Sequence, residues 1–258
     1  MTRTKAVALA ALGFAVFLAI WELAPALGFI SASVLPPPSV LPQAFLRELS
    51  SGIWFAALLT SLRHYLAGLV IGCTLGVGLG VATGMSDTLE ASLAWVIRVL
   101  RPIPGLAWVP FAILWFGIDA TAAIFIIGIG VFWISYFAAH GAVRAVDRDL
   151  IEVAEAFGFR RPDQKLIKVI LPSAAPGILA GLRTALGQAW MAVVASEIFG
   201  VPGLGQRMMQ AANLLASDVV VVYMATMAAL YGMFDSGFVA LQSWLLRWKR
   251  KSVSSRSG

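Results

Sequence analysis

The sequence contains few of the residues on which soluble enzymes depend. Only 12% of its 258 residues are charged, whereas soluble domains carry about 25%. Its one cysteine, Cys73, lies inside an apolar run, which excludes a disulfide within the chain and a cysteine-ligated metal site. His64 and His140 are far apart and have no carboxylate or cysteine cluster beside them, so we expect no metal site. The sequence shows no nucleophilic side chain with a base that would serve it in catalysis.

Apolar residues dominate instead: they make up 60% of the chain, and the mean hydropathy is +0.86. A membrane-spanning helix needs about 20 apolar residues, so this length holds five to seven of them. The composition predicts an all-α integral membrane protein of about six transmembrane helices, in one domain over residues 1–258. Apolar blocks bounded by proline, glycine or charge place these helices at residues 6–25, 57–84, 101–117, 120–139, 173–198 and 219–246.

Two of these helices have special features. The start of the chain is similar to a secretory signal, which has basic residues, an apolar run and a cleavage site of small residues. Here these would be Arg3 and Lys5, residues 6–20, and Ala24-Pro25-Ala26. The apolar run reaches Leu23 and further spans follow, so we expect a retained first helix.

Prolines interrupt the block 101–117, and we expect a short or broken helix there. Such a helix is tolerable in a membrane if neighbouring helices satisfy its free backbone groups.

The basic residues predict the orientation. With the N-terminus inside, fifteen of the 19 Lys and Arg residues fall in inner segments and only Arg47 and Arg207 in outer ones. By the positive-inside rule both termini lie in the cytoplasm. The net charge of +6 therefore reflects the membrane topology, because the basic residues lie where lipid headgroups and cytoplasm are. It does not indicate binding of nucleic acid.

Two extracytoplasmic segments, 30–56 and 199–218, are expected to contain short helices. A proline run at Leu35-Pro36-Pro37-Pro38-Ser39 favours extended chain before a surface helix at 40–49. Glycines and Pro202 precede a second short helix at 206–216. Both helices can meet an external partner or simply pack at the membrane interface.

Five glycines recur every fourth residue in the second span: Gly68, Gly72, Gly76, Gly80 and Gly84. This spacing forms one stripe on which another backbone can approach closely. Close helix packing is the ordinary interpretation, and a sliding surface between moving helices is compatible with it.

Charges within the apolar blocks are costly in a bilayer and should face the protein interior or water. Four of them, with one tryptophan, are candidates for a translocation pathway: Arg63, Arg183, Trp190, Glu197 and Asp235. Snorkelling explains the arginines equally well, and ion pairs or core packing explain the others.

A charged island at 144–172 holds about a third of the charged residues. Asp147 or Asp149 can cap a helix over 150–157, with Glu152 in a capping-box relation to Asp149 and Gly158 as terminator. Leu150, Val153, Ala154 and Phe157 would share one face of that helix. A second short helix, 164–170, is expected to end before Pro172. Two short amphipathic helices outside the membrane need another surface against which their apolar faces can pack.

These residues resemble the permease subunit of bacterial ABC importers, whose cytoplasmic signature is Glu-Ala-Ala, three residues, Gly, nine residues, Ile-x-Leu-Pro. Glu152-Val153-Ala154, Gly158 and Val169-Ile170-Leu171-Pro172 match it, with valine for the first alanine and ten intervening residues. The extra residue is placed near 160–163. Leu35-Pro36-Pro37-Pro38-Ser39, Arg101-Pro102-Ile103-Pro104, Leu114-Trp115-Phe116-Gly117 and Gly203-Leu204-Gly205 resemble the branch that includes nitrate, sulfonate and taurine permeases.

The resemblance implies a type I importer permease in the inner membrane. It would work with a second permease copy, in a homodimer, with a cytoplasmic ATPase dimer and with an extracytoplasmic substrate-binding protein. Glu152, Val153, Ala154, Phe157, Gly158, Leu171 and Pro172 would couple the chain to the ATPase. This chain has no phosphate loop, so ATP and Mg would bind the partner. A self-contained carrier or channel leaves the island unexplained and often shows inverted repeats; a multi-pass enzyme lacks a catalytic cluster.

Overall fold

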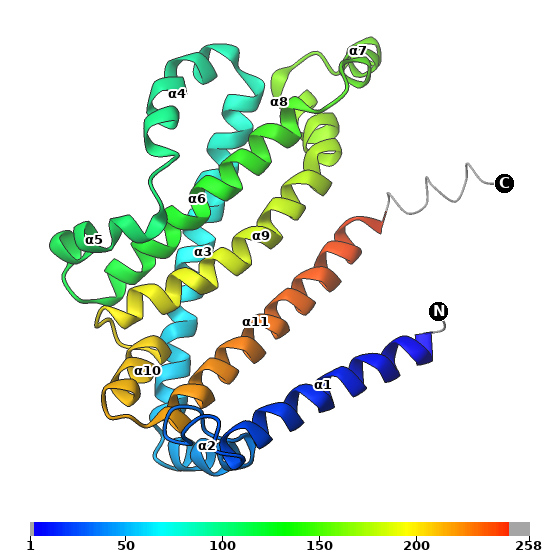
Figure 1. The fold of residues 1–258 in the computed structure, drawn as a ribbon. Coiled ribbons are helices and arrows are strands. Elements are labelled where there is room, and N and C mark those ends of the chain that lie inside the picture. The colour runs from blue at the N-terminus through cyan, green and yellow to red at the C-terminus, as the bar shows by residue number, and fades with distance from the viewer. Residues whose placement is uncertain (1–2, 248–258) are drawn as a thin grey trace. The chain divides into compact units, whose positions relative to one another are not determined.

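The computed structural model describes residues 3–247, and helices form most of that range (Figure 1). In this range five helices are long and apolar enough to span a membrane, and the number is six if a bent pair of shorter helices is counted as one span. This confirms the predicted all-α fold. The long helices are α1 (Arg3–Ala26), α3 (Ile53–Met85), α6 (Ala120–Arg144), α9 (Leu171–Ile198) and α11 (Ser217–Leu245). Four of the basic residues that predict the orientation, Lys249, Arg250, Lys251 and Arg256, lie outside the described residues.

The third span differs from its prediction. The predicted span begins at residue 101, but the residues before it also form a helix, α4 (Asp87–Leu100). Ser86 caps it by accepting a hydrogen bond from the Leu89 amide at 3.2 Å, and Asp87 and Glu90 favour its N-terminal dipole. After a break follow η2 (Gly105–Trp108) and α5 (Val109–Phe116), bent from α4 by 82°. The predicted broken helix is confirmed, and it begins earlier than expected.

The described chain divides into two compact units. The first comprises residues up to Thr60 together with Pro202–Ala229, and the second comprises Ser61–Val201 with residues from Leu230 onward. The helices α3 and α11 contribute residues to both units.

In the first unit, the end of α1 is hydrogen-bonded to the proline-rich segment. The indole Nε1 of Trp21 donates to the Pro36 carbonyl at 3.0 Å. Glu22 of α1 accepts from the amide and the hydroxyl of Ser39 at 3.1 and 2.7 Å, so this carboxylate in an apolar helix has a partner. The segment leads through η1 (Pro38–Val40) into α2 (Leu41–Ser50), as predicted, and the other predicted short helix is α10 (Leu204–Asn213).

A buried carboxylate joins three elements of the first unit. Glu48 of α2 is 7% exposed and accepts two hydrogen bonds from Arg207 of α10, at 3.1 and 2.9 Å. The hydroxyl of Tyr223 of α11 donates to the same carboxylate at 2.6 Å. The hydrogen bonds from Arg207 lower the pKa of Glu48 below its ordinary value of 4.5, although burial opposes them.

Replacing Glu48 by glutamine is expected to destabilise the protein by about 2 kcal/mol, because Arg207 is left without a balancing charge in a mostly buried site. The depressed pKa means that the pair stabilises at pH above 4.5 and that this stability is lost as pH falls through the folded pKa. Melting in detergent at falling pH measures both effects. The control is Arg47→Gln, whose exposed pair with Asp218 should contribute under about 1 kcal/mol. Equal losses in both variants would contradict the prediction.

Close packing of α3 against α6 organises the second unit. A Cβ atom added at Gly72, Gly76 or Gly80 would lie 2.4 to 2.5 Å from a carbonyl oxygen of α6. At Gly68 and Gly84 it would meet side chains of α6 at 2.6 and 2.8 Å. All five glycines of the stripe are buried. The stripe therefore lets the two helices touch from Gly68 to Gly84, about half the length of α3.

On its other side α6 runs beside α9 (Figure 1). Gly181 of α9 faces Ala138, and Gly177 faces Ala142, so small residues again mark the contact. A buried cluster at one end of this pair comprises Ala139, Val143, Ile170, Ala174 and Ile178. This end carries the charged loop between α6 and α9.

Candidate functional site

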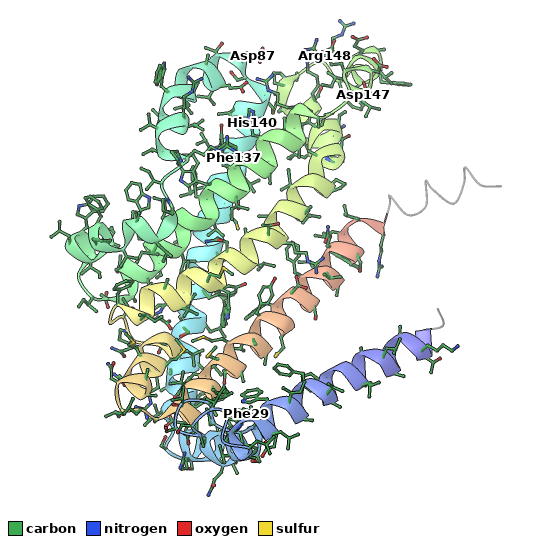
Figure 2. The ribbon with its side chains drawn as sticks, viewed as in Figure 1. Phe29, Asp87, Phe137, His140, Asp147 and Arg148 are labelled. Carbon is green, nitrogen blue, oxygen red and sulfur yellow. The ribbon has the colours of Figure 1, made fainter. Side chains whose placement is uncertain are left out.

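The charged loop begins with a capped helix, α7 (Arg148–Ala156). Asp147 is its cap, and its Oδ1 accepts from the Asp149 amide at 3.0 Å. The alternative, a capping box between Asp149 and Glu152, is wrong, because the helix starts one residue before Asp149. Figure 2 shows Asp147 and Arg148 at the start of this loop.

The predicted apolar face of α7 is partly exposed to solvent and partly buried against the rest of the chain. Leu150, Val153 and Phe157 are 49%, 53% and 79% exposed. Ala154, predicted on the same face, is 6% exposed and lies against the chain, so it supports the helix and is not on the exposed surface. We call Leu150, Val153 and Phe157 the apolar face of α7.

Gly158 ends the helix in a backbone conformation that other residues rarely adopt. Its φ is +91°, and no atom lies within 4 Å of a Cβ built there. Conformation, and not space, therefore favours glycine at this position. The Phe159 amide then bonds back to the Ala154 carbonyl at 2.9 Å, which closes the turn.

An ion pair ties α7 to the second half of the loop. Lys165, at the end of α8 (Pro162–Lys165), donates to Glu155 Oε1 at 2.8 Å. The hydrogen bond from Lys165 lowers the pKa of Glu155. Glu152, on the exposed side of α7, lies next to the apolar face and contributes its charged border.

The second short helix was predicted at 164–170, ending before Pro172, and this is wrong. Residues Leu166–Ile170 form a π turn, η3, that passes directly into α9. Pro172 stands directly after this π turn, at the second position of α9. Leu171 and Pro172 therefore belong to a continuous helical segment, Pro162–Ile198.

A polar network lies at the same end of the second unit as the loop. Arg144, the last residue of α6, pairs with Asp87 at 2.6 Å and with Glu90 of α4. His140 Nε2 lies 3.3 Å from Glu90 Oε1, so this histidine does have a carboxylate neighbour. Figure 2 shows Asp87 and His140 near the loop residues Asp147 and Arg148. These contacts fix the end of α6 from which the loop departs.

The candidate pathway residues occupy different environments. Arg183 of α9 and Asp235 of α11 form a bidentate ion pair at 2.7 and 2.8 Å, with side chains 48% and 24% exposed. Arg63 of α3 is exposed. Trp190 is buried, with Tyr65 and Phe234 rings at 5.0 and 6.2 Å.

Glu197 is fully buried inside the second unit. Its carboxylate accepts from the Ser61 hydroxyl at 2.8 Å and lies 3.1 Å from His64 Nδ1. Sequence reasoning did not connect these three residues. Their one signal was the three-residue spacing of Ser61 and His64 within an apolar helix, which places both on one face.

The arrangement offers an interaction surface and ion pairs, and no metal centre. Among residues 3–247, no three His, Cys, Asp or Glu side chains come together as a possible metal site. Apolar side chains bordered by charges, as on α7, suit an interface that forms and rearranges.

Comparison with known proteins identifies the family of this chain. The family model described as "Binding-protein-dependent transport system inner membrane component" matches residues 68–251. Two proteins named putative aliphatic sulfonates transport permease protein SsuC are similar. The one from Escherichia coli (strain K12) is 39% identical over 231 residues, 89% of this chain and 88% of its own length. The one from Bacillus subtilis (strain 168) is 36% identical over 236 residues, 91% and 85%.

The taurine transport system permease protein TauC of Escherichia coli (strain K12) is 34% identical over 244 residues, covering 91% of this chain and 87% of its own. An inward-facing structure of the MetNI methionine ABC transporter shares the fold, with a TM-score of 0.61 and 23% identity over 78% of this chain and 97% of its own. The chain belongs to the inner-membrane permease family of binding-protein-dependent ABC importers.

Proposed function

We propose that this permease imports its solute with energy from ATP hydrolysed on a separate ATPase dimer. The observation that carries the proposal is the apolar face of α7, on which Leu150, Val153 and Phe157 remain exposed. An apolar face bordered by Glu152 and the Glu155 ion pair is suited to a groove in a partner protein. ATP and Mg would bind that partner.

The proposed topology has both termini and the 144–172 loop in the cytoplasm of a bacterial cell, with 30–56 and 199–218 outside. A second copy of the chain would complete the pathway as a homodimer. A substrate-binding protein would deliver the solute to the outer segments, where the Glu48 and Arg207 pair keeps α2 and α10 together.

The solute we propose is a small organic or inorganic anion, such as an alkanesulfonate, taurine or nitrate. Relatives named for aliphatic sulfonates and taurine support this class. Exposed cations within the spans suit an anion, and we propose that Arg183 and Arg63 line the pathway. Asp235 would hold Arg183 in place, while Trp190 and Glu197 support the helices around it.

Reconstitution in proteoliposomes tests this function. The permease with its ATPase, its binding protein and internal ATP should accumulate an alkanesulfonate, and uptake should stop when ATP is omitted. Uptake by this chain alone, driven by an ion gradient, would contradict the proposal and identify a self-contained carrier.

Exchanging the charges of the Arg183 and Asp235 pair separates a role in transport from one in structure. Arg183→Gln should lower sulfonate uptake about 10- to 100-fold, the range for a lost charge-assisted hydrogen bond. The double variant Arg183→Asp, Asp235→Arg restores the ion pair with the charges on opposite helices. We expect it to recover the melting temperature but not uptake. Full recovery of both would mean that the pair is only structural.

A further inference from the structure

The end of α4 that precedes the break carries a cavity unrelated to the charged loop. It has a volume of about 480 Å³ and is lined by Ala94, Ile97, Arg98, Arg101 and Pro102. Two of the five lining residues are therefore cations, and the others are apolar.

These two arginines differ from the cations of the second unit that form ion pairs. Within residues 3–247, neither Arg98 nor Arg101 takes part in a salt bridge, whereas Arg144 and Arg183 both do. Instead, Arg98 lies over the Trp95 ring at 5.3 Å and Arg101 over the Phe137 ring at 4.6 Å. A guanidinium held against an aromatic ring keeps N–H donors that can bind an anion.

Large apolar side chains next to the cavity are exposed. Trp95, Val96 and Val99 are 72%, 52% and 59% exposed on the same helix. Tryptophan and arginine together on an apolar helix are typical of the boundary between headgroups and acyl chains.

The position of the cavity along α6 agrees with that boundary. Phe137, under Arg101, precedes Arg144 at the helix end by seven residues, a distance of about 10 Å along the axis. The headgroup region of one leaflet is about 5 to 8 Å thick. Figure 2 shows Phe137 farther than His140 from the end that carries Asp87 and the loop. With Arg144 at the aqueous edge, Phe137 therefore lies about 2 to 5 Å below the headgroup region, and Arg101, 4.6 Å from its ring, lies close to the boundary between headgroups and acyl chains.

We propose that Arg98 and Arg101 bind the phosphate of an anionic phospholipid, whose acyl chains lie along Trp95, Val96 and Val99. Two cations without a protein carboxylate complement a lipid with net negative charge better than a zwitterionic one. The proposed cytoplasmic orientation puts the site in the leaflet rich in such lipids, but lipid binding itself does not require transport or an ATPase.

Native mass spectrometry of the full-length permease in detergent, titrated with phosphatidylglycerol or phosphatidylcholine, tests the site. We expect tighter binding of one phosphatidylglycerol. Each surface cation contributes about fivefold to binding of an anionic lipid, so Arg98→Gln, Arg101→Gln should weaken it roughly 30-fold. The Arg98→Lys, Arg101→Lys variant keeps the charge and should retain most of the binding.

The matched control removes two exposed cations from the charged loop, Arg148→Gln and Arg160→Gln, and should leave phosphatidylglycerol binding within about twofold. Equal losses in both double variants would reduce the effect to net charge and overturn the site. Displacement of the lipid by ethanesulfonate at the same arginines would assign the cavity to the transported anion. Loss of lipid binding on dimerisation would assign it to a second copy. Either result would overturn the proposal.

Discussion

Glutamate in place of Phe157 is expected to abolish ATP-driven uptake and to weaken binding of the ATPase at least about 30-fold. Aromatic residues at the centre of an interface commonly contribute about 2 kcal/mol or more. Phe157 is 79% exposed at the end of α7, so the substitution leaves the folded chain intact. A carboxylate at this position would have to lose its water inside the partner's groove.

Phe29 provides the matched control, because it is also 79% exposed but belongs to the first unit (Figure 2). Phe29→Glu should insert in the membrane and retain the ATPase. Co-purification of the complex and ATP-dependent uptake in proteoliposomes give the two measurements. If Phe157→Glu retained the ATPase at wild-type strength, the apolar face of α7 would not be the docking surface.

Leucine in place of Gly72 is expected to prevent the second unit from folding. Even a Cβ atom there would lie 2.4 Å from the Gly128 carbonyl oxygen and 2.7 Å from Val131 Cγ2. Backbone atoms cannot move aside as side chains do, so α3 and α6 would have to separate along the stripe. We expect a loss of about 3 kcal/mol or more for Gly72→Ala, at the upper end of the range for overpacked cores, and no folded protein for leucine.

Gly78 lies on the same helix, and a Cβ atom added to it would have no atom within 4 Å. Gly78→Ala should be neutral or stabilise the helix by up to about 1 kcal/mol, because alanine has the higher helix propensity. Yield of monodisperse protein and the melting temperature in detergent report both variants. Similar behaviour of Gly72→Ala and Gly78→Ala would show that contact with α6 is not what the stripe provides.

The sequence predicted the features that depend on local composition and short spacing. Apolar runs located the spans because a bilayer requires them, and Asp147 and Gly158 were recognisable as the ends of α7. One local feature was missed. Helix α4 was not predicted, although Ser86 as a cap, with Asp87 and Glu90 in the first turn, is typical of a helix start.

The partners of buried polar residues could not be predicted in the same way. Glu197 meets Ser61 and His64 across more than 130 positions, and Glu48 meets Arg207 across 159. Such pairs depend on how helices cross, which no local pattern specifies. Ala154 shows the same limit at short range: spacing placed it on the face of α7, but packing against the chain decided which edge of that face is covered.

The π turn at Leu166–Ile170 bears on the length of the charged loop. A π turn closes its hydrogen bonds over five residues where an α-helix uses four, so it takes in one extra residue for the same rotation. The importer signature that this sequence resembles has nine residues after the glycine, and this chain has ten. We infer that the π turn takes up the extra residue, which the sequence alone placed near 160–163. A single added residue is then accommodated within the helix, and the residues on either side of the turn keep their helical positions.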